Sequence, residues 1–308
     1  MLLLRENMRA YPIKTKYIKR GENFIPIVVE AIKNSGISLE DGDFVVLSEK
    51  MVSTAEGNFV DENNFKPGIL AYFCYYWSKY LWGHILGKLL KVKEDKIKNL
   101  RNMPKEETLK HKQTIIETVG LRYALKPYAE GGVDLTNVPG TYACPLPKNP
   151  KKWAEELYKE IKKELGVDVV VMVADTDATY KVLNFYVTAL PYAIDGIISG
   201  IGVFGFILGR LADVLKIGGF VGCTPLAIAG NEKYYKKYSI YELVRIAFIC
   251  DRVHKTIKNI NEVLEKYNSY IITEEILEKL EHTPVVVVKM KEEYLPAEQG
   301  KDKSNNSN

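Results

Sequence analysis

The feature that most constrains the fold is a run of six apolar residues, Val169–Ala174, followed directly by Asp175, Thr176 and Asp177. A run without polar interruption is typical of a strand buried on both faces, as in the parallel sheets of α/β proteins. Such strands end at the rim of the sheet, where ligands commonly bind. The acidic ending therefore has two interpretations: an ordinary turn, since Asp and Thr are common turn formers, or a site for a cation or a phosphate.

Helices and strands alternate along the chain, which predicts an α/β class (mixed α+β) with mixed sheets and flanking helices. Pro150 after Asn149 and Gly166 at the far end delimit one helix, and Ser239 with Glu242 has the spacing of a capping box. The predicted helices cover residues 24–32, 69–100, 150–165 and 239 to about 267, and the predicted strands cover 44–47, 169–174 and 285–288. We expect one domain over residues 1–290, with two subdomains of about 1–180 and 181–290 as an alternative, and a disordered polar tail over 291–308.

Composition excludes several classes of function. A net charge of +4 over 308 residues gives no reason to expect nucleic acid as a partner. The four cysteines form no CxxC pair, which argues against a zinc ribbon or a thioredoxin-type motif and favours free thiols in a reducing cytosol. The apolar start is short and soon charged, unlike a secretory signal, so we expect a cytoplasmic protein.

The stretch from Val182 to Gly209 contains a single charged residue, Asp195, and is rich in glycine. Its longest uncharged part that resembles a helix, Gly196–Gly209, falls short of the ~20 residues that span a bilayer. Pro191 and the glycines disfavour a spanning helix further. We therefore expect a buried substructure or a subunit interface here, and no membrane contact.

Two glycine motifs are weak. Gly200–Gly205 has the letters of a dinucleotide fingerprint but lacks the preceding strand and the later acidic residue, so close helix packing explains its glycines better. Gly218–Thr224 has no following lysine, although its N–H groups remain candidates for phosphate binding. The histidines show no metal-ligand spacing, and we expect His84 and His254 to be structural or exposed.

A second acidic loop, Gly131–Gly140, contains Asp134 and, three residues later, Asn137. Mg²⁺ and Mn²⁺ prefer hard oxygen ligands, often one or two carboxylates completed by water and phosphate oxygens. Asp134 and Asp175 would supply such a site if the fold brings them together. Taken alone, each loop is also consistent with an ordinary turn.

Three stretches in this order resemble the coenzyme F420:L-glutamate ligase family, which adds glutamate to the tail of a deazaflavin cofactor. Residues 40–57 resemble its strand and "QKIVSKAEG" turn, residues 132–140 its "GIDxSNVPG" loop, and residues 150–176 its helix, strand and "SDT" ending. The likeness is good from about Tyr11 to Tyr180. It is weaker beyond Tyr180. Two further departures are the replacement of a family lysine by Thr54 and the absence of an arginine between Asp177 and Arg210. A divergent paralogue is the description that fits these departures.

The resemblance implies a GTP-dependent amide ligase that uses bound Mg²⁺ or Mn²⁺, with nucleotide, carboxylate and amine as substrates. Implied metal ligands are Asp134 and Asp175, with Thr176 beside the second; the positions implied to contact nucleotide are Ser48, Glu49, Lys50 and Asn137. Lys50 and Asp175 are the candidate catalytic residues, since a lysine and a metal both neutralise charge during phosphoryl transfer. Asp177 is expected to cap the following segment, with a third-ligand role as the alternative.

Other possibilities stay open at this stage. One is a protein that binds nucleotide and metal without ligase activity, whose apolar glycine-rich region contacts a partner or a membrane surface. ATP in place of GTP is another. A homodimer is expected because the segment Tyr72–Trp82 has more aromatic surface than a short helix can bury alone.

Overall fold

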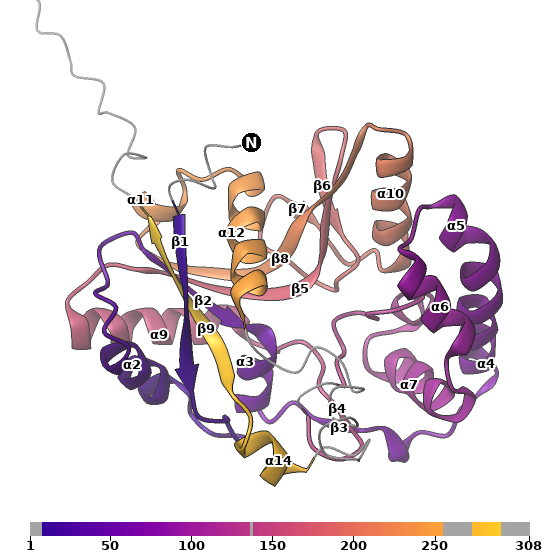
Figure 1. Cartoon of the computed structure of the whole chain (residues 1–308), viewed down its shortest axis with the longest axis horizontal. Coiled ribbons are helices and arrows are strands. Elements are labelled where there is room, and N and C mark those ends of the chain that lie inside the picture. The colour runs from indigo at the N-terminus through magenta and orange to yellow at the C-terminus, as the bar shows by residue number, and fades with distance from the viewer. Residues whose placement is uncertain (1–7, 136–137, 255–272, 291–308) are drawn as a thin grey trace, which may run out of the picture.

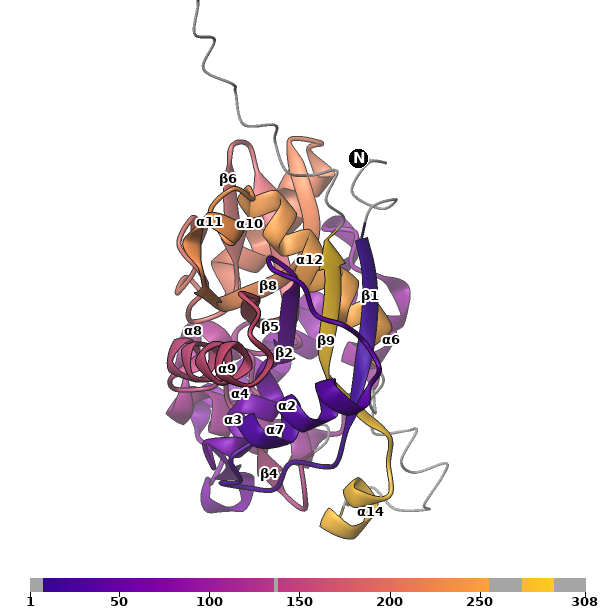
Figure 2. The same cartoon turned by 90° about the vertical axis from the view of Figure 1, so that its left-hand side faces the viewer.

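Strand β5 (Val170–Val182) occupies the centre of the main sheet in the computed structural model, which describes residues 8–135, 138–254 and 273–290. It pairs in parallel with β2 (Phe44–Ser48) and antiparallel with β8 (Gly218–Gly230). Beyond β2 the sheet continues antiparallel through β9 (His282–Met290) to β1 (Met8–Thr15), and Figure 2 shows these three strands side by side. The C-terminal strand of the described chain thus lies between two N-terminal ones.

The inner strands are buried on both faces, which explains their unbroken apolar sequence. One core lies between the sheet and helices α2 (Ile25–Asn34) and α9 (Pro150–Leu165), and the other between the sheet and α12 (Ile240–Val253). Alternate residues of the strands enter the two cores, as a period of two requires. The first core receives Val45, Leu47, Val171 and Val173, and the second receives Phe44, Val46, Val170 and Met172.

The second half of β5 extends beyond this double-layered region. There it pairs with β6 (Phe185–Thr188), which pairs with β7 (Ile197–Ile198), and α10 (Val203–Val214) packs against β5, β6 and β8. A group of helices lies next to α10, on the side of the molecule away from β1 and β9 (Figure 1). These helices are α4 (Ile69–Tyr76), the π-helix η2 (Trp77–Leu86), α5 (Gly87–Leu89), α6 (Glu94–Asn102), α7 (Lys105–Thr118) and α8 (Leu121–Ala124).

Short elements complete the described chain. Helix α3 (Glu49–Ala55) follows β2 without a loop, and a two-stranded sheet joins β3 to β4. The remaining bounds are Val60–Asp61 for β3, Glu62–Asn64 for the 3₁₀ turn η1, Tyr142–Ala143 for β4, Glu232–Tyr235 for α11 and Glu274–Glu278 for α14.

The predicted mixed α/β class is confirmed, as are the helix at Pro150–Leu165 and the capping box at Ser239 and Glu242. The region predicted as helical over residues 69–100 is a series of helices, with a break before α6. Gly218–Thr224, considered as a phosphate loop, lies within strand β8 and pairs with β5. The predicted end of the late helix and the predicted tail at 291–308 lie outside the described residues. Among the helices that are described, none is long and apolar enough to cross a membrane.

Candidate active site

The parallel pairing of β2 with β5 brings the first two groups of site residues together. Ser48 at the end of β2 lies opposite Ala174 in the register, so Glu49 and Lys50 emerge beside Asp175. Carboxyl ends of adjacent parallel strands meet at one edge, which is where α/β proteins place ligands. The sequence thus delivers a lysine and two carboxylates to one edge from segments more than a hundred residues apart.

Asp175 does not end its strand, contrary to the prediction that β5 stops at Ala174. In the pairing with β8, Asp175 lies opposite Thr224 and the next matched residue is Ala178, opposite Cys223, so Thr176 and Asp177 have no partners across the strand. This is a β-bulge, a device that turns side chains out of the regular alternation. The backbone N–H of Asp177 donates to Asp175 Oδ1 at 2.5 Å inside the bulge. The ordinary-turn interpretation of this segment is therefore wrong.

Asp134 reaches the same place from a third segment. Its backbone forms an isolated antiparallel bridge with Cys144, with N···O distances of 2.9 and 2.8 Å in the two directions. This bridge holds the loop so that Asp134 Oδ2 lies 2.5 Å from Lys50 Nζ. Lys50 is thereby directed toward the acidic edge of the sheet rather than toward solvent.

These side chains line one cavity of about 230 Å³. Its walls include Ser48, Glu49, Lys50, Asp134, Asp175 and Thr176. Every predicted site residue that the structure describes is therefore in this set; Asn137 lies outside the described residues. Asp134 and Asp175, distant in sequence, do face a common space.

Two of the carboxylates that line the cavity are buried. Asp175 is 5% exposed and Glu49 is 7% exposed. Burial, together with the charges of Glu49 and Asp177, raises the pKa of Asp175 well above its usual value. Burial likewise raises the pKa of Glu49 to about 7, against the opposing effect of Lys50. A cation that enters this cavity would relieve the repulsion among these carboxylates.

Lys50 is the positive charge that the cavity already contains. Burial by itself lowers the pKa of Lys50, but the carboxylates of Asp134 and Glu49 outweigh it, so the net change is upward. The lysine is thus held in its charged form, as a fixed point charge beside the carboxylates. Such a charge suits contact with phosphate oxygens.

The donor set suits a metal that is completed by ligands from a substrate. In the described residues, no three His, Cys, Asp or Glu side chains are grouped closely enough to hold a metal by themselves. Mg²⁺ binds through one or two carboxylates together with water and phosphate oxygens, so it does not need a dedicated protein cage. The carboxylate of Asp175, the nearby Asp134 and the hydroxyl of Thr176 fit that requirement.

Sequence reasoning missed one wall of the cavity. Cys223 of β8 and Cys250, Asp251 and His254 at the end of α12 also line it. The Nδ1 of His254 donates to the carbonyl oxygen of Thr283 at 2.5 Å, so His254 lies at the cavity and is not merely exposed. These residues come from the part of the sequence where the resemblance was weak, and no motif there indicated their position.

A smaller cavity of about 60 Å³ adjoins the first, since both are lined by Ser48, Lys50, His254 and Pro284. Its other walls are Lys16, Tyr17, Ile18, Met51, Thr54, His282 and Thr283. Lysine, histidine and hydroxyl groups outnumber acidic groups among these residues. No local sequence motif predicts this smaller cavity, referred to below as the annex, because β1 and β9 meet there only through long-range pairing.

Comparison with known proteins agrees with this geometry. The sequence matches the family described as F420-0:Gamma-glutamyl ligase over residues 12–231, which is most of the chain. The chain belongs to this family. The match includes Asp134, Asp175 and the Ser48–Lys50 turn, and membership in the F420-0:gamma-glutamyl ligase family supports a ligase function.

The relatives of this family member differ widely in their sequence identity to it. The chain is 92% identical over 292 residues to uncharacterized protein MJ1361 of Methanocaldococcus jannaschii, covering 95% of this chain and 100% of that protein. It is 25% identical over 162 residues to coenzyme F420:L-glutamate ligase of Methanothermobacter thermautotrophicus, covering 51% of this chain and 56% of the other. It is also 25% identical over 171 residues to coenzyme F420:L-glutamate ligase of Methanopyrus kandleri, covering 54% of this chain and 57% of the other. The similarity thus spans just over half the length of each named ligase.

Proposed function

We propose that this protein is a GTP- and metal-dependent ligase that activates a carboxylate as an acyl phosphate and joins it to an amine such as glutamate. The observation that carries the proposal is the convergence of Asp134, Asp175 and Lys50 on one cavity in a member of an amide ligase family. The name of the two distant relatives, coenzyme F420:L-glutamate ligase, supports L-glutamate as the amine and coenzyme F420 as the source of the acceptor.

The proposed reaction has two steps. A carboxylate oxygen of the acceptor attacks the γ-phosphorus of GTP, and GDP leaves with the electrons of the broken P–O bond. The amine then attacks the acyl carbon, inorganic phosphate leaves, and the amine loses a proton as the amide forms. A carboxylate is a poor electrophile, so the first step makes the second possible.

The residues of the cavity have distinct tasks in this proposal. Asp134, Asp175 and Thr176 hold Mg²⁺ or Mn²⁺, which when bound neutralises charge on the phosphate oxygens. Lys50 provides a second positive charge for the transferred phosphoryl group. Ser48, Glu49 and Asn137 contact the nucleotide in this proposal.

A second candidate is a nucleotide- and metal-binding protein without ligase activity. It is favoured by the exposed apolar side chains of α10 and its neighbours, among them Phe204 at 61% and Leu215 at 56% exposure. Such a surface suits contact with a partner or a membrane more than catalysis. Under this alternative the cavity binds its ligands but releases no phosphate.

Calorimetric titration of Mn²⁺ with GTP or ATP tests the binding that both candidates require. A phosphate-release assay with carboxylate acceptors and glutamate then separates them. Ligase activity predicts phosphate release that needs acceptor, amine and metal together. Binding without phosphate release under any substrate combination would favour the second candidate, and no nucleotide binding at all would contradict both.

A further inference from the structure

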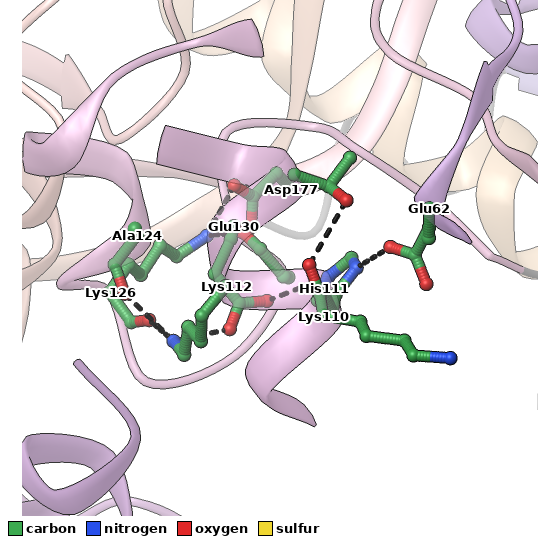
Figure 3. A network of polar contacts seen from close by, with 10 residues as sticks. Glu62, Lys110, His111, Lys112, Ala124, Lys126, Glu130 and Asp177 are labelled. Atoms are coloured by element: carbon green, nitrogen blue, oxygen red, sulfur yellow. Dashed lines mark hydrogen bonds and ion pairs between the residues drawn. The ribbon is translucent and has the colours of Figure 1, made fainter. Parts of the chain in front are cut away.

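A network of buried charges joins helix α7 to the segment that follows α8 and reaches Asp177 of β5 (Figure 3). Lys112 and Lys126 are only 1% and 2% exposed. Lys112 Nζ donates to the carbonyl oxygens of Ala124 and Lys126 at 2.7 and 2.9 Å, and to Glu130 Oε1 at 2.7 Å. One ammonium group thus fixes the backbone of residues 124–130 against α7.

His111 strengthens the same network from the next position of α7. Its Nδ1 lies 2.7 Å from Glu62 Oε1, and its Nε2 lies 3.7 Å from Glu130 Oε2. Glu130 therefore lies between the charges of His111 and Lys112. The segment that carries Lys126 is held from two sides by residues that do not themselves reach the cavity.

Lys126 connects this network to the cavity. Its Nζ donates to the carbonyl oxygen of Ala129 at 2.6 Å and forms a short ion pair with the carboxylate of Asp177. Asp177 is one of the two unmatched residues of the β5 bulge, and its N–H donates to Asp175 Oδ1. Asp177 is thus the one residue that links the buried ammonium group of Lys126 to the carboxylate of Asp175, which faces the cavity.

Asp177 is therefore neither a cap nor a lining residue of the cavity, although the sequence favoured a cap. A third contact is also structural: the carbonyl oxygen of Asp177 accepts from Thr224 Oγ1 of β8 at 2.8 Å. The bulge has no regular ladder partners at Thr176 and Asp177, so these side-chain contacts take the place of the missing backbone pairing. Without Lys126, the buried charge of Asp177 would be uncompensated beside Asp175.

We propose that Lys126 is a positioning residue of the active site: by anchoring Asp177 it holds the β5 bulge in the conformation that directs Asp175 into the cavity. The inference rests on the proposed function only where it concerns the metal that Asp175 holds. The charge of Lys126 also opposes the effects of Glu49 and Asp177 on the pKa of Asp175. The helical group around α7 thereby acts as the rigid support of one metal ligand.

Hydrogen exchange of the full chain, measured by mass spectrometry, tests the anchoring directly. Lys126→Met should accelerate exchange in residues 174–180 by about ten-fold or more, while residues 44–48 of β2 stay protected. Lys289→Met is the matched control, because Lys289 forms an ion pair with buried Asp43, 2.7 Å away and at the opposite end of β2. Equal acceleration in both variants, or none at residues 174–180, would overturn the proposal.

Mn²⁺ titration followed by electron paramagnetic resonance tests the consequence for the site. Lys126→Met should weaken Mn²⁺ binding by about ten-fold or more, and Lys289→Met should leave it unchanged. The double variant Lys126→Met/Asp177→Asn removes both charges, so it should recover the stability lost in Lys126→Met but not the Mn²⁺ affinity. Recovery of both would mean that Lys126 only neutralises the charge of Asp177, and this would overturn the positioning role. If the wild-type chain binds no Mn²⁺, the proposed function fails, and the exchange measurement still decides the role of Lys126.

Discussion

Asp175 illustrates how burial prepares a side chain for chemistry at the scale of single residues. Its carboxylate is 5% exposed and lies near Glu49 and Asp177, so its ionised form is disfavoured until a cation arrives. Lys50 responds to the same surroundings in the opposite way and stays charged, because carboxylates outweigh its desolvation. The candidate site residues Asp175 and Lys50, and the segments that carry them, could be predicted from the sequence. The contribution of Lys126 could not, since no local pattern indicates which buried lysine meets Asp177.

Replacement of Asp175 with Asn should weaken Mn²⁺ affinity by about 100-fold or more and abolish phosphate release, because a buried ligand charge is lost. The variant should remain folded, since the amide is of similar size and removes an unfavourable buried charge. Asp195→Asn, at an exposed position outside the cavity walls, is the control. Calorimetric titration and a phosphate-release assay measure the two effects; unchanged turnover in Asp175→Asn would remove the proposed mechanism.

His111 predicts a pH dependence of stability. Burial lowers the pKa of His111, but Glu130 and Glu62 outweigh it and raise the pKa from 6.5 to about 9. A folded-state pKa above the unfolded one adds stability that is complete below pH 6.5 and lost as the pH rises through about 9. This difference corresponds to at most about 3 kcal/mol. Urea unfolding between these pH values should show a decline in the wild type that His111→Gln lacks, and parallel curves for both would contradict the assignment.

Helices and strands were predictable where their patterns are local. The capping box of α12, Pro150 at the start of α9 and left-handed Gly166 at its end all occur as expected. Asn149 occupies the N-cap position, but its side chain makes no capping bond; Glu56 instead accepts from the N–H groups of Lys148 and Asn149. The β5 bulge escaped prediction because it depends on the register with β8, which is set by residues about fifty positions away.

The capping box affects the site through α12, which carries part of the cavity wall. Ser239→Ala removes a bond to the N–H of Glu242 and should lower the free energy of unfolding by about 1 kcal/mol. Ser239→Asp should retain most of the stability, because aspartate caps equally well. Thermal unfolding measures both variants. A loss of the same size in Ser239→Asp would show that capping is not the reason.

For the molecule as a whole, the fold class and the order of the three resembling segments were predictable, whereas the insertion of β9 between β1 and β2 was not. That pairing joins residues from the two ends of the described chain, and no local sequence pattern predicts which distant strands pair. The second wall of the cavity and the basic annex both follow from this arrangement, since α12 packs on the sheet and β9 reaches the annex beside β1.

The exposed surface of the whole molecule supports the expectation of a homodimer. Within Tyr72–Trp82, Phe73, Tyr76 and Tyr80 are 53%, 43% and 54% exposed, and the rings of Tyr76 and Tyr80 stack with centroids 5.8 Å apart. A second copy would cover this apolar surface. Light scattering should give a dimer, and Tyr76→Lys/Tyr80→Lys should give a monomer, with Phe204→Lys on α10 as the comparison. A monomeric wild type would reject the expectation, and dissociation only in Phe204→Lys would assign the interface to α10.

Asp134 and Asp175 are proposed to hold one metal–phosphate cluster together with Lys50. Anomalous diffraction from crystals soaked with Mn²⁺ and GTP locates manganese independently of any assay. We expect a manganese peak in the cavity, at coordinating distance from the Asp175 carboxylate, with the γ-phosphate between the manganese and Lys50. Manganese bound elsewhere, or nucleotide bound away from these three side chains, would show that the proposed site is wrong.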